Sequence, residues 1–89
     1  MDLLELREQI DEIDQDLVRL FCRRMEIAAK VADYKKEKNL PVYHPEREQE
    51  ILRKVAQMAG PEMEHDICRL YSLLFELSRN YQCKRNGVF

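Results

Sequence analysis

The chain of 89 residues has few of the residues that make turns, with two glycines and three prolines, and it has no tryptophan. Few turns favour a small number of long helices. No apolar run reaches the roughly 18 residues that a membrane-spanning helix needs. The first segment, MDLLELREQ, is acidic and lacks the basic and apolar regions of a signal peptide. These absences argue against membrane and secreted classes, and we expect a cytoplasmic protein.

Motifs for metal, nucleotide and nucleic-acid chemistry are also missing. The cysteines at 22, 68 and 83 lie too far apart for a CxxC clip, which predicts free thiols in a reducing compartment. His44 and His65 have no partners at metal-ligand spacing, and the sequence has no GxGxxG, P-loop or GxSxG motif. Charges of both signs alternate and leave a net charge of −2, so nucleic-acid binding is not expected. We therefore expect no metal and no cofactor.

What is present is helical periodicity in three stretches, which predicts an all-α fold of three helices in a single domain, residues 1–89. The first helix runs from about 2 to 38, and Pro41 follows it. The second runs from about 45 to 59, because proline suits a first helical turn and Gly60-Pro61 ends the pattern. The third runs from about 62 to 84, and the residues after it resemble a frayed end. Its inner face is predicted to carry Ile67, Leu70, Tyr71, Leu74, Leu77 and Tyr81.

The first helix carries a ladder of residues at alternating three- and four-residue spacing, which places them on one helical face. The ladder consists of Leu3, Leu6, Ile10, Ile13, Leu17, Leu20, Arg24, Ile27, Val31 and Tyr34. A helix of about 37 residues is roughly 55 Å long, more than the width of a globule of this size. We therefore expect its apolar face to pair with a second copy of the chain.

Arg24 is the charged member of this ladder, and burying it requires an anion. Lys35 lies eleven residues later, about 16 Å along the axis, and the small Ala28 and Ala32 lie between them. Two long cationic side chains above small residues predict a pocket for an anion. Arg7 is on the same flank but about 25 Å from Arg24 along a straight helix. In an antiparallel dimer, Arg7 of one chain meets Arg24 of the other.

Polar residues also occupy the inner faces of the other two helices. Glu48 heads the apolar stripe of the second helix with Arg47 beside it, and Ser78 and Gln82 lie four residues apart on the third. Structural interpretations exist for single residues: Arg24 can set register by pairing with an acid across an interface, Ser78 can be an ordinary helix serine, and Glu48 can complement the helix dipole. The occurrence of all these groups on inner faces favours a ligand site.

Four segments stand in a characteristic order, namely LxxLR (3–7), RRMEIAAKVADYK (23–35), PVYHPEREQEIL (41–52) and ELSRNYQ (76–82). Over essentially its whole length the chain thereby resembles the all-helical (type II) chorismate mutase family. The resemblance implies an intertwined homodimer that shares the long first helices and forms two active sites. It also implies an isomerase that rearranges chorismate to prephenate in phenylalanine and tyrosine biosynthesis.

The resemblance further implies roles for eight residues. Arg7 of the partner chain and Arg24 bind the substrate carboxylates, and Lys35 and Gln82 contact the ether oxygen whose bond breaks. Arg24, Lys35 and Gln82 are thus the implied catalytic residues.

The other four implied roles are in substrate binding. Glu48 holds the ring hydroxyl, with Arg47 beside it, and Ser78 lies near the ring carboxylate. His44 stands where many relatives have an aspartate, at a contact with the hydroxyl that the backbone largely makes. Two alternatives remain: isochorismate pyruvate lyase activity on the same fold, or a non-catalytic helical dimerisation module with Arg24 paired to Asp14 or Asp16 of the partner.

Overall fold

The computed structural model describes residues 1–87, which form three α-helices: α1 (Leu3–Glu37), α2 (Pro45–Ala59) and α3 (Glu64–Asn86). The predicted all-α class and the long first helix are confirmed, and α2 has the predicted bounds. The third helix begins and ends two residues later than the predicted range of about 62 to 84. It ends at Gly87, which takes a left-handed conformation (φ 75°) and donates its N–H to the carbonyls of Cys83 and Lys84.

Local sequence explains where the first two helices begin and end. The Asp2 carboxylate accepts a 2.8 Å hydrogen bond from the Glu5 N–H and so caps α1. Asn39, in the left-handed region at φ 57°, directs the chain away after α1. Pro45 opens α2, and Gly60 at φ 86° ends it. The connection between Asn39 and Pro45 is therefore short and has a defined path.

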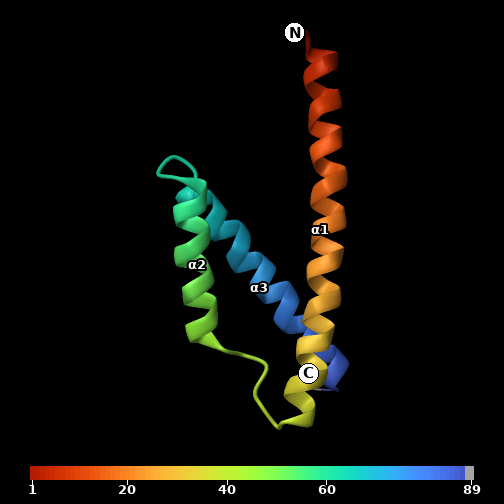
Figure 1. Cartoon of the computed structure of the whole chain (residues 1–89), viewed down its shortest axis with the longest axis vertical. Coiled ribbons are helices and arrows are strands. Elements are labelled where there is room, and N and C mark those ends of the chain that lie inside the picture. The colour runs from red at the N-terminus through yellow and green to blue at the C-terminus, as the bar shows by residue number, and fades with distance from the viewer. Residues whose placement is uncertain (88–89) are drawn as a thin grey trace.

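The helices are arranged with α3 against both α1 and α2, whereas α1 and α2 do not pack on each other within residues 1–87. Figure 1 shows the N-terminal half of α1 projecting well beyond the other two helices. The molecule is accordingly elongated, 54 × 26 × 18 Å. Its small apolar core consists of Ala28 and Ala32 on α1, Val55 on α2 and Phe75 on α3.

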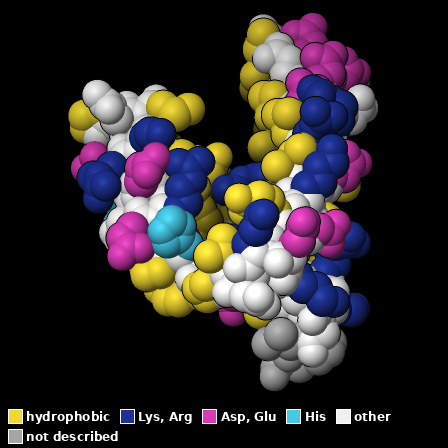
Figure 2. All heavy atoms as spheres, turned by 60° about the horizontal axis from the view of Figure 1, so that its bottom comes forward, with side chains coloured by type: hydrophobic (Ala, Val, Ile, Leu, Met, Phe, Trp, Pro, Cys, Tyr) yellow, Lys and Arg dark blue, Asp and Glu magenta, His cyan; other side chains and the backbone are white. Residues whose placement is uncertain are grey.

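Most of the apolar ladder of α1 is exposed in the single chain. Relative exposures reach 55% at Ile10, 57% at Ile13 and 56% at Leu17. Leu70 and Leu77, predicted on the inner face of the third helix, are also exposed in the single chain, at 55% and 41%. Figure 2 shows hydrophobic side chains along the projecting arm of α1, beside a hollow that separates this arm from the rest of the molecule.

The exposed area is larger than a folded monomer of this mass requires. The chain exposes 7351 Å², whereas a monomer of 10.7 kDa is expected to expose about 5,500 Å². The excess is concentrated in an apolar helix face, which is energetically unfavourable in water. Across residues 1–87, no helix is both long enough and apolar enough to cross a membrane.

Candidate active site

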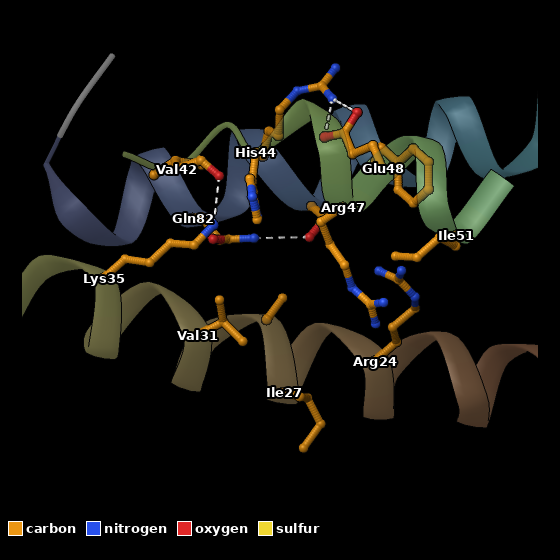
Figure 3. Close-up of a pocket in the computed structure, with 14 residues that line it drawn as sticks. Arg24, Ile27, Val31, Lys35, Val42, His44, Arg47, Glu48, Ile51 and Gln82 are labelled. Atoms are coloured by element: carbon orange, nitrogen blue, oxygen red, sulfur yellow. Dashed lines mark hydrogen bonds and ion pairs between the residues drawn. The ribbon is translucent and has the colours of Figure 1, made fainter. Parts of the chain in front are cut away.

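A cavity of about 340 Å³ lies between α1 and α2, with α3 closing its third side. Seven of the eight predicted site residues line it: Arg24, Lys35, His44, Arg47, Glu48, Ser78 and Gln82. Figure 3 shows side chains from all three helices directed into this space. Arg7 does not line it, because it lies in the projecting half of α1, about 25 Å from Arg24 by the rise of the helix.

The wall formed by α1 follows from helical spacing. Arg24, Ala28 and Lys35 all line the cavity, since residues four and eleven positions apart lie on nearly the same helical face. Ala28 is 6% exposed and leaves room between the two cations. Ala32 was predicted to share this role, but it is fully buried and does not line the cavity. Of the two small residues predicted between Arg24 and Lys35, only Ala28 therefore lines the cavity.

Arg24 is held by aromatic rings. Its guanidinium carbon lies 5.9 Å from the ring centroid of Tyr71 and 5.9 Å from that of Phe75, both on α3. These distances suit cation–π attraction. No carboxylate forms an ion pair with Arg24 in the described part of the chain, where Asp16 instead pairs with Arg19 at 3.4 Å. The guanidinium thus retains most of its hydrogen-bonding capacity.

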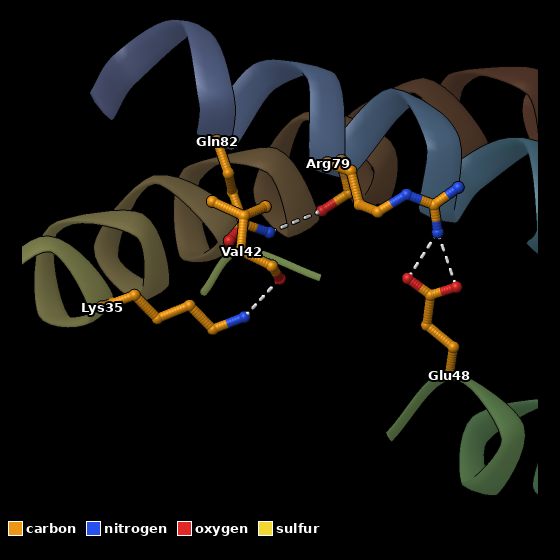
Figure 4. Close-up of polar contacts among 6 residues, drawn as sticks. Lys35, Val42, Glu48, Arg79 and Gln82 are labelled. Atoms are coloured by element: carbon orange, nitrogen blue, oxygen red, sulfur yellow. Dashed lines mark hydrogen bonds and ion pairs between the residues drawn. The ribbon is translucent and has the colours of Figure 1, made fainter. Parts of the chain in front are cut away.

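Lys35, at the other end of the α1 wall, is anchored by the backbone. Its Nζ donates a 2.7 Å hydrogen bond to the carbonyl oxygen of Val42, in the connection between α1 and α2. An ammonium group has three donors, so two remain for a ligand. Figure 4 shows the Lys35 side chain extended toward this connection, with Gln82 nearby.

The first turns of α2 contribute charges of both signs. Arg47 Nη1 donates to the Glu50 carboxylate at 2.7 Å. The pKa of Glu50 lies below its usual value, first because of Lys54 and then because of Arg47. At the start of α2, His44 Nε2 lies 3.3 Å from a Glu46 carboxylate oxygen. Arg47 and His44 each therefore have an acidic neighbour outside the cavity lining.

Glu48 has a partner that the sequence did not predict. Arg79 Nη1, on α3, donates to both carboxylate oxygens of Glu48 at 2.6 and 2.5 Å. This bond is the main reason that the pKa of Arg79 is raised. Arg79 directly follows Ser78 on α3. The helix turns by about 100° per residue, so Arg79 points toward α2 instead of in the direction of Ser78. The sequence pointed to Arg79 only through its position in the ELSRNYQ segment (76–82), which also contains the predicted site residues Ser78 and Gln82.

Ser78 and Gln82 form a buried polar pair on α3, each 7% exposed. Gln82 Nε2 donates to Ser78 Oγ at 3.2 Å, and Gln82 Oε1 is buried with no hydrogen-bond partner. The amide nitrogen has a second hydrogen available. A buried acceptor without a partner is costly, and the second amide hydrogen is the donor that this pair can offer to a ligand.

The lining has an excess of positive charge. Four basic side chains, Arg24, Lys35, Arg47 and Arg79, face one carboxylate, that of Glu48. A cavity with this balance attracts a small anion carrying more than one negative charge. Among residues 1–87, no group of His, Cys, Asp and Glu has the arrangement of a metal site.

Comparisons with known proteins agree with this geometry. The family described as chorismate mutase type II matches residues 6–83. The chain is similar to the "Chorismate mutase" of Methanocaldococcus jannaschii, with 29% identity over 85 residues that cover 90% of this chain and 83% of that protein. It is also similar to the "Bifunctional chorismate mutase/prephenate dehydratase" of Aquifex aeolicus, with 40% identity over 57 residues, or 64% of this chain and 16% of that protein.

A third relative is the "T-protein" of Enterobacter agglomerans, which is 40% identical over 73 residues, 76% of this chain and 20% of that protein. The chain thus spans only about a fifth or less of the two longer relatives. No solved structure matches it. Because the family match covers most of the three-helix chain, including every residue that lines the cavity, the chain belongs to the type II chorismate mutase family.

Proposed function

We propose that this chain is an isomerase that converts chorismate to prephenate, a step of phenylalanine and tyrosine biosynthesis. The observation that carries the proposal is the cavity between the helices, where Arg24 and Lys35 have no acidic partner in residues 1–87 and lie with the buried amide of Gln82. Chorismate has two carboxylates, so its charge offsets two of the three excess positive charges of the described lining. Family membership and the names of the relatives support the same assignment.

The rearrangement moves an enolpyruvyl group within one molecule, and it needs no proton transfer and no covalent intermediate. Side chains accelerate such a reaction by selecting the compact conformer and by stabilising the charge that develops on the ether oxygen. We assign Arg24 to one carboxylate, as a bidentate donor. We assign the remaining donors of Lys35 and Gln82 to the ether oxygen, where they bind more strongly as the bond to carbon breaks.

The remaining lining residues are assigned to binding. Glu48 accepts a hydrogen bond from the ring hydroxyl, and Ser78 lies with Gln82 on the α3 side, next to the ring carboxylate. His44 and Arg47 border the cavity at the start of α2. Because Arg47 is bound to Glu50, its guanidinium is held in place before a ligand arrives. We treat residues 1–89 as one domain that carries all these roles.

The proposed active form is an antiparallel homodimer in which Arg7 of the partner subunit completes each cavity. Two observations support it: the apolar ladder of α1 is exposed, and the chain exposes 7351 Å², roughly 1,800 Å² more than expected for a monomer. A typical stable interface covers about 800 Å² of each partner. The excess is about twice that area and falls within the roughly 1,000–2,500 Å² per partner of obligate homodimers. In the proposed dimer, Arg7 of the partner subunit adds a further cation beside the substrate.

The test is a direct assay of the purified chain with chorismate and, separately, with isochorismate. Loss of chorismate absorbance together with formation of prephenate is the expected result. Release of pyruvate from isochorismate without turnover of chorismate assigns the chain to lyase chemistry instead. Lack of turnover of both compounds by a folded dimer contradicts both activities and favours a dimerisation module. An Arg24→Ala variant is the control, because it removes a cavity cation.

A further inference from the structure

Arg79 connects three segments that border the cavity. It lies on α3, and its Nη1 donates to both carboxylate oxygens of Glu48 on α2 at 2.6 and 2.5 Å. Its guanidinium carbon also lies 5.1 Å from the ring centroid of Tyr43, in the connection between α1 and α2. Figure 4 shows Arg79 turned toward Glu48, on the opposite side from Lys35 and Gln82.

The carboxylate of Glu48 depends on Arg79 for its orientation. The adjacent Arg47 is bound to Glu50, and in the described chain no other side chain hydrogen bonds to the Glu48 carboxylate. The pair is partly shielded, with side-chain exposures of 33% for Arg79 and 20% for Glu48. A charged hydrogen bond in such surroundings is stronger than one in open water. Removing Arg79 therefore frees the Glu48 side chain to change rotamer.

The ion pair between Arg79 and Glu48 also lowers the electrostatic repulsion between Glu48 and an anionic ligand. Among the described residues, Glu48 is the only carboxylate in the lining, and without a cation beside it, it repels a ligand that carries two carboxylates. Each carboxylate oxygen has two lone pairs, so binding to Arg79 leaves acceptor capacity for a hydroxyl. The pairing thus keeps Glu48 as an acceptor while reducing its repulsion.

We propose that Arg79 is a positioning residue for substrate binding: it fixes Glu48 as the acceptor for the substrate hydroxyl and offsets its charge, and it is itself fixed by the ring of Tyr43. This inference rests on the proposed function. The hydroxyl takes no part in the bonds that form and break, so we expect its contact with Glu48 to be about equally strong in the ground state and the transition state. Loss of Arg79 therefore raises KM and leaves kcat nearly unchanged.

The experiment is a double-mutant cycle with wild type, Arg79→Met, Glu48→Gln and the double variant, each assayed with chorismate. Arg79→Met should raise KM by about tenfold to a hundredfold, the range expected for loss of a charge-assisted hydrogen bond. In the Glu48→Gln background the same substitution should change KM by less than about twofold, because its effect passes through Glu48. If the two increases in KM multiply, or if the loss lies in kcat, the positioning role is wrong.

Two further variants separate positioning from general destabilisation. Arg85→Met removes a comparable ion pair between helices, Arg85 to Asp33 at 3.0 Å, outside the cavity lining, and it should leave KM unchanged. Arg79→Lys keeps the charge but loses the planar group over Tyr43, so its KM should lie between those of wild type and Arg79→Met. If Arg79→Met does not fold, Arg79→Lys is the deciding variant. A KM for Arg79→Lys equal to that of wild type overturns the proposal. A raised KM supports it if the increase disappears when the same substitution is made in Glu48→Gln.

The failure of this inference is distinct from the failure of the proposed function. If wild-type protein does not convert chorismate, the proposed function fails first and the role of Arg79 with it. If wild type is active and the KM effects of Arg79→Met and Glu48→Gln multiply, only the role of Arg79 fails. A chorismate analogue that lacks the ring hydroxyl gives an independent check. With it, the hydroxyl contact is absent and only the charge effect remains, so the KM values of wild type and Arg79→Met should differ by less than they do with chorismate.

Discussion

Lys35 and Val42, seven positions apart in the chain, are joined by a 2.7 Å hydrogen bond from the ammonium group to the backbone carbonyl. The bond holds the cationic end of Lys35 at the edge of the cavity and ties the connection between α1 and α2 to α1. No carboxylate neutralises this ammonium within residues 1–87. The positive charge is thus fixed in place and still available to a ligand.

The first prediction concerns this charge. Lys35→Met should lower kcat for chorismate by about a hundredfold to a thousandfold, the usual loss for one donor to a developing anionic oxygen. Lys36→Met is the matched control, because Lys36 is exposed on the neighbouring face and should keep wild-type kcat. Steady-state kinetics with helical circular dichroism on both variants makes the comparison. A folded Lys35→Met enzyme with wild-type kcat contradicts the role at the ether oxygen.

A second prediction follows from Glu50, whose pKa is lowered by Lys54 and Arg47 from its ordinary value of 4.5. A carboxyl with a lowered folded pKa stabilises the fold above its unfolded pKa. That contribution is lost as pH falls through the lower folded value. Glu50→Gln removes it at every pH. The difference in Tm between wild type and Glu50→Gln should therefore be larger at pH 7 than at pH 3, and a difference that grows in acid would be the opposite result.

The third prediction concerns assembly. If a second copy covers the α1 ladder, dissociation exposes that ladder and the chain loses helical structure. Light scattering and circular dichroism across a dilution series should show loss of the dimer and of helicity together. A well-folded monomer at low micromolar concentration contradicts the intertwined arrangement.

The fourth prediction tests whether the site is shared. Arg7→Ala and Arg24→Ala homodimers should each be nearly inactive, because every site in them lacks one arginine. In the heterodimer, one of the two sites receives both wild-type arginines. Unfolding and refolding an equal mixture should restore about a quarter of wild-type activity, since half of the dimers are mixed and each has one intact site. A mixture as inactive as its parents shows that the two arginines do not come from different chains.

The sequence predicted the helices well because their signals are local. Pro45 and Gly60 mark both ends of α2, and helical spacing placed Arg24 and Lys35 on one face of α1. The end of α3 at Gly87, in a left-handed conformation, is also a local signal, and the prediction stopped two residues short of it. Arg85 is bound to Asp33 of α1, 52 positions away, which favours continuation of the helix past the predicted end.

The cavity itself was predictable only in part. Its α1 and α3 walls follow from spacing within single helices, whereas the pairing of Glu48 with Arg79 joins residues 31 positions apart. Whether Arg79 turns toward α2 or toward solvent depends on how α2 packs on α3, which periodicity does not specify. Leu70 and Leu77 illustrate the same limit, since their apolar character predicts burial without identifying the surface that buries them.

The last prediction tests whether Gln82 acts on the transition state. Its amide is neutral, so it donates at any pH near neutrality, and its buried position shields it from water. In Gln82→Glu only the protonated carboxyl can donate to the ether oxygen, and the ionised form repels the charge that develops there. Burial raises the pKa of the introduced carboxyl above its reference value of about 4.3.

Activity of Gln82→Glu should therefore fall as pH rises through that pKa, whereas wild type should be much flatter over the same range. The loss should lie mainly in kcat, because the contact strengthens only as the bond breaks. Gln49→Glu on α2 is the matched control, since residue 49 is exposed and outside the lining, and its pH profile should follow that of wild type. A Gln82→Glu enzyme with normal kcat and no pH dependence would mean that Gln82 does not reach the ether oxygen, and that Lys35 stabilises it alone.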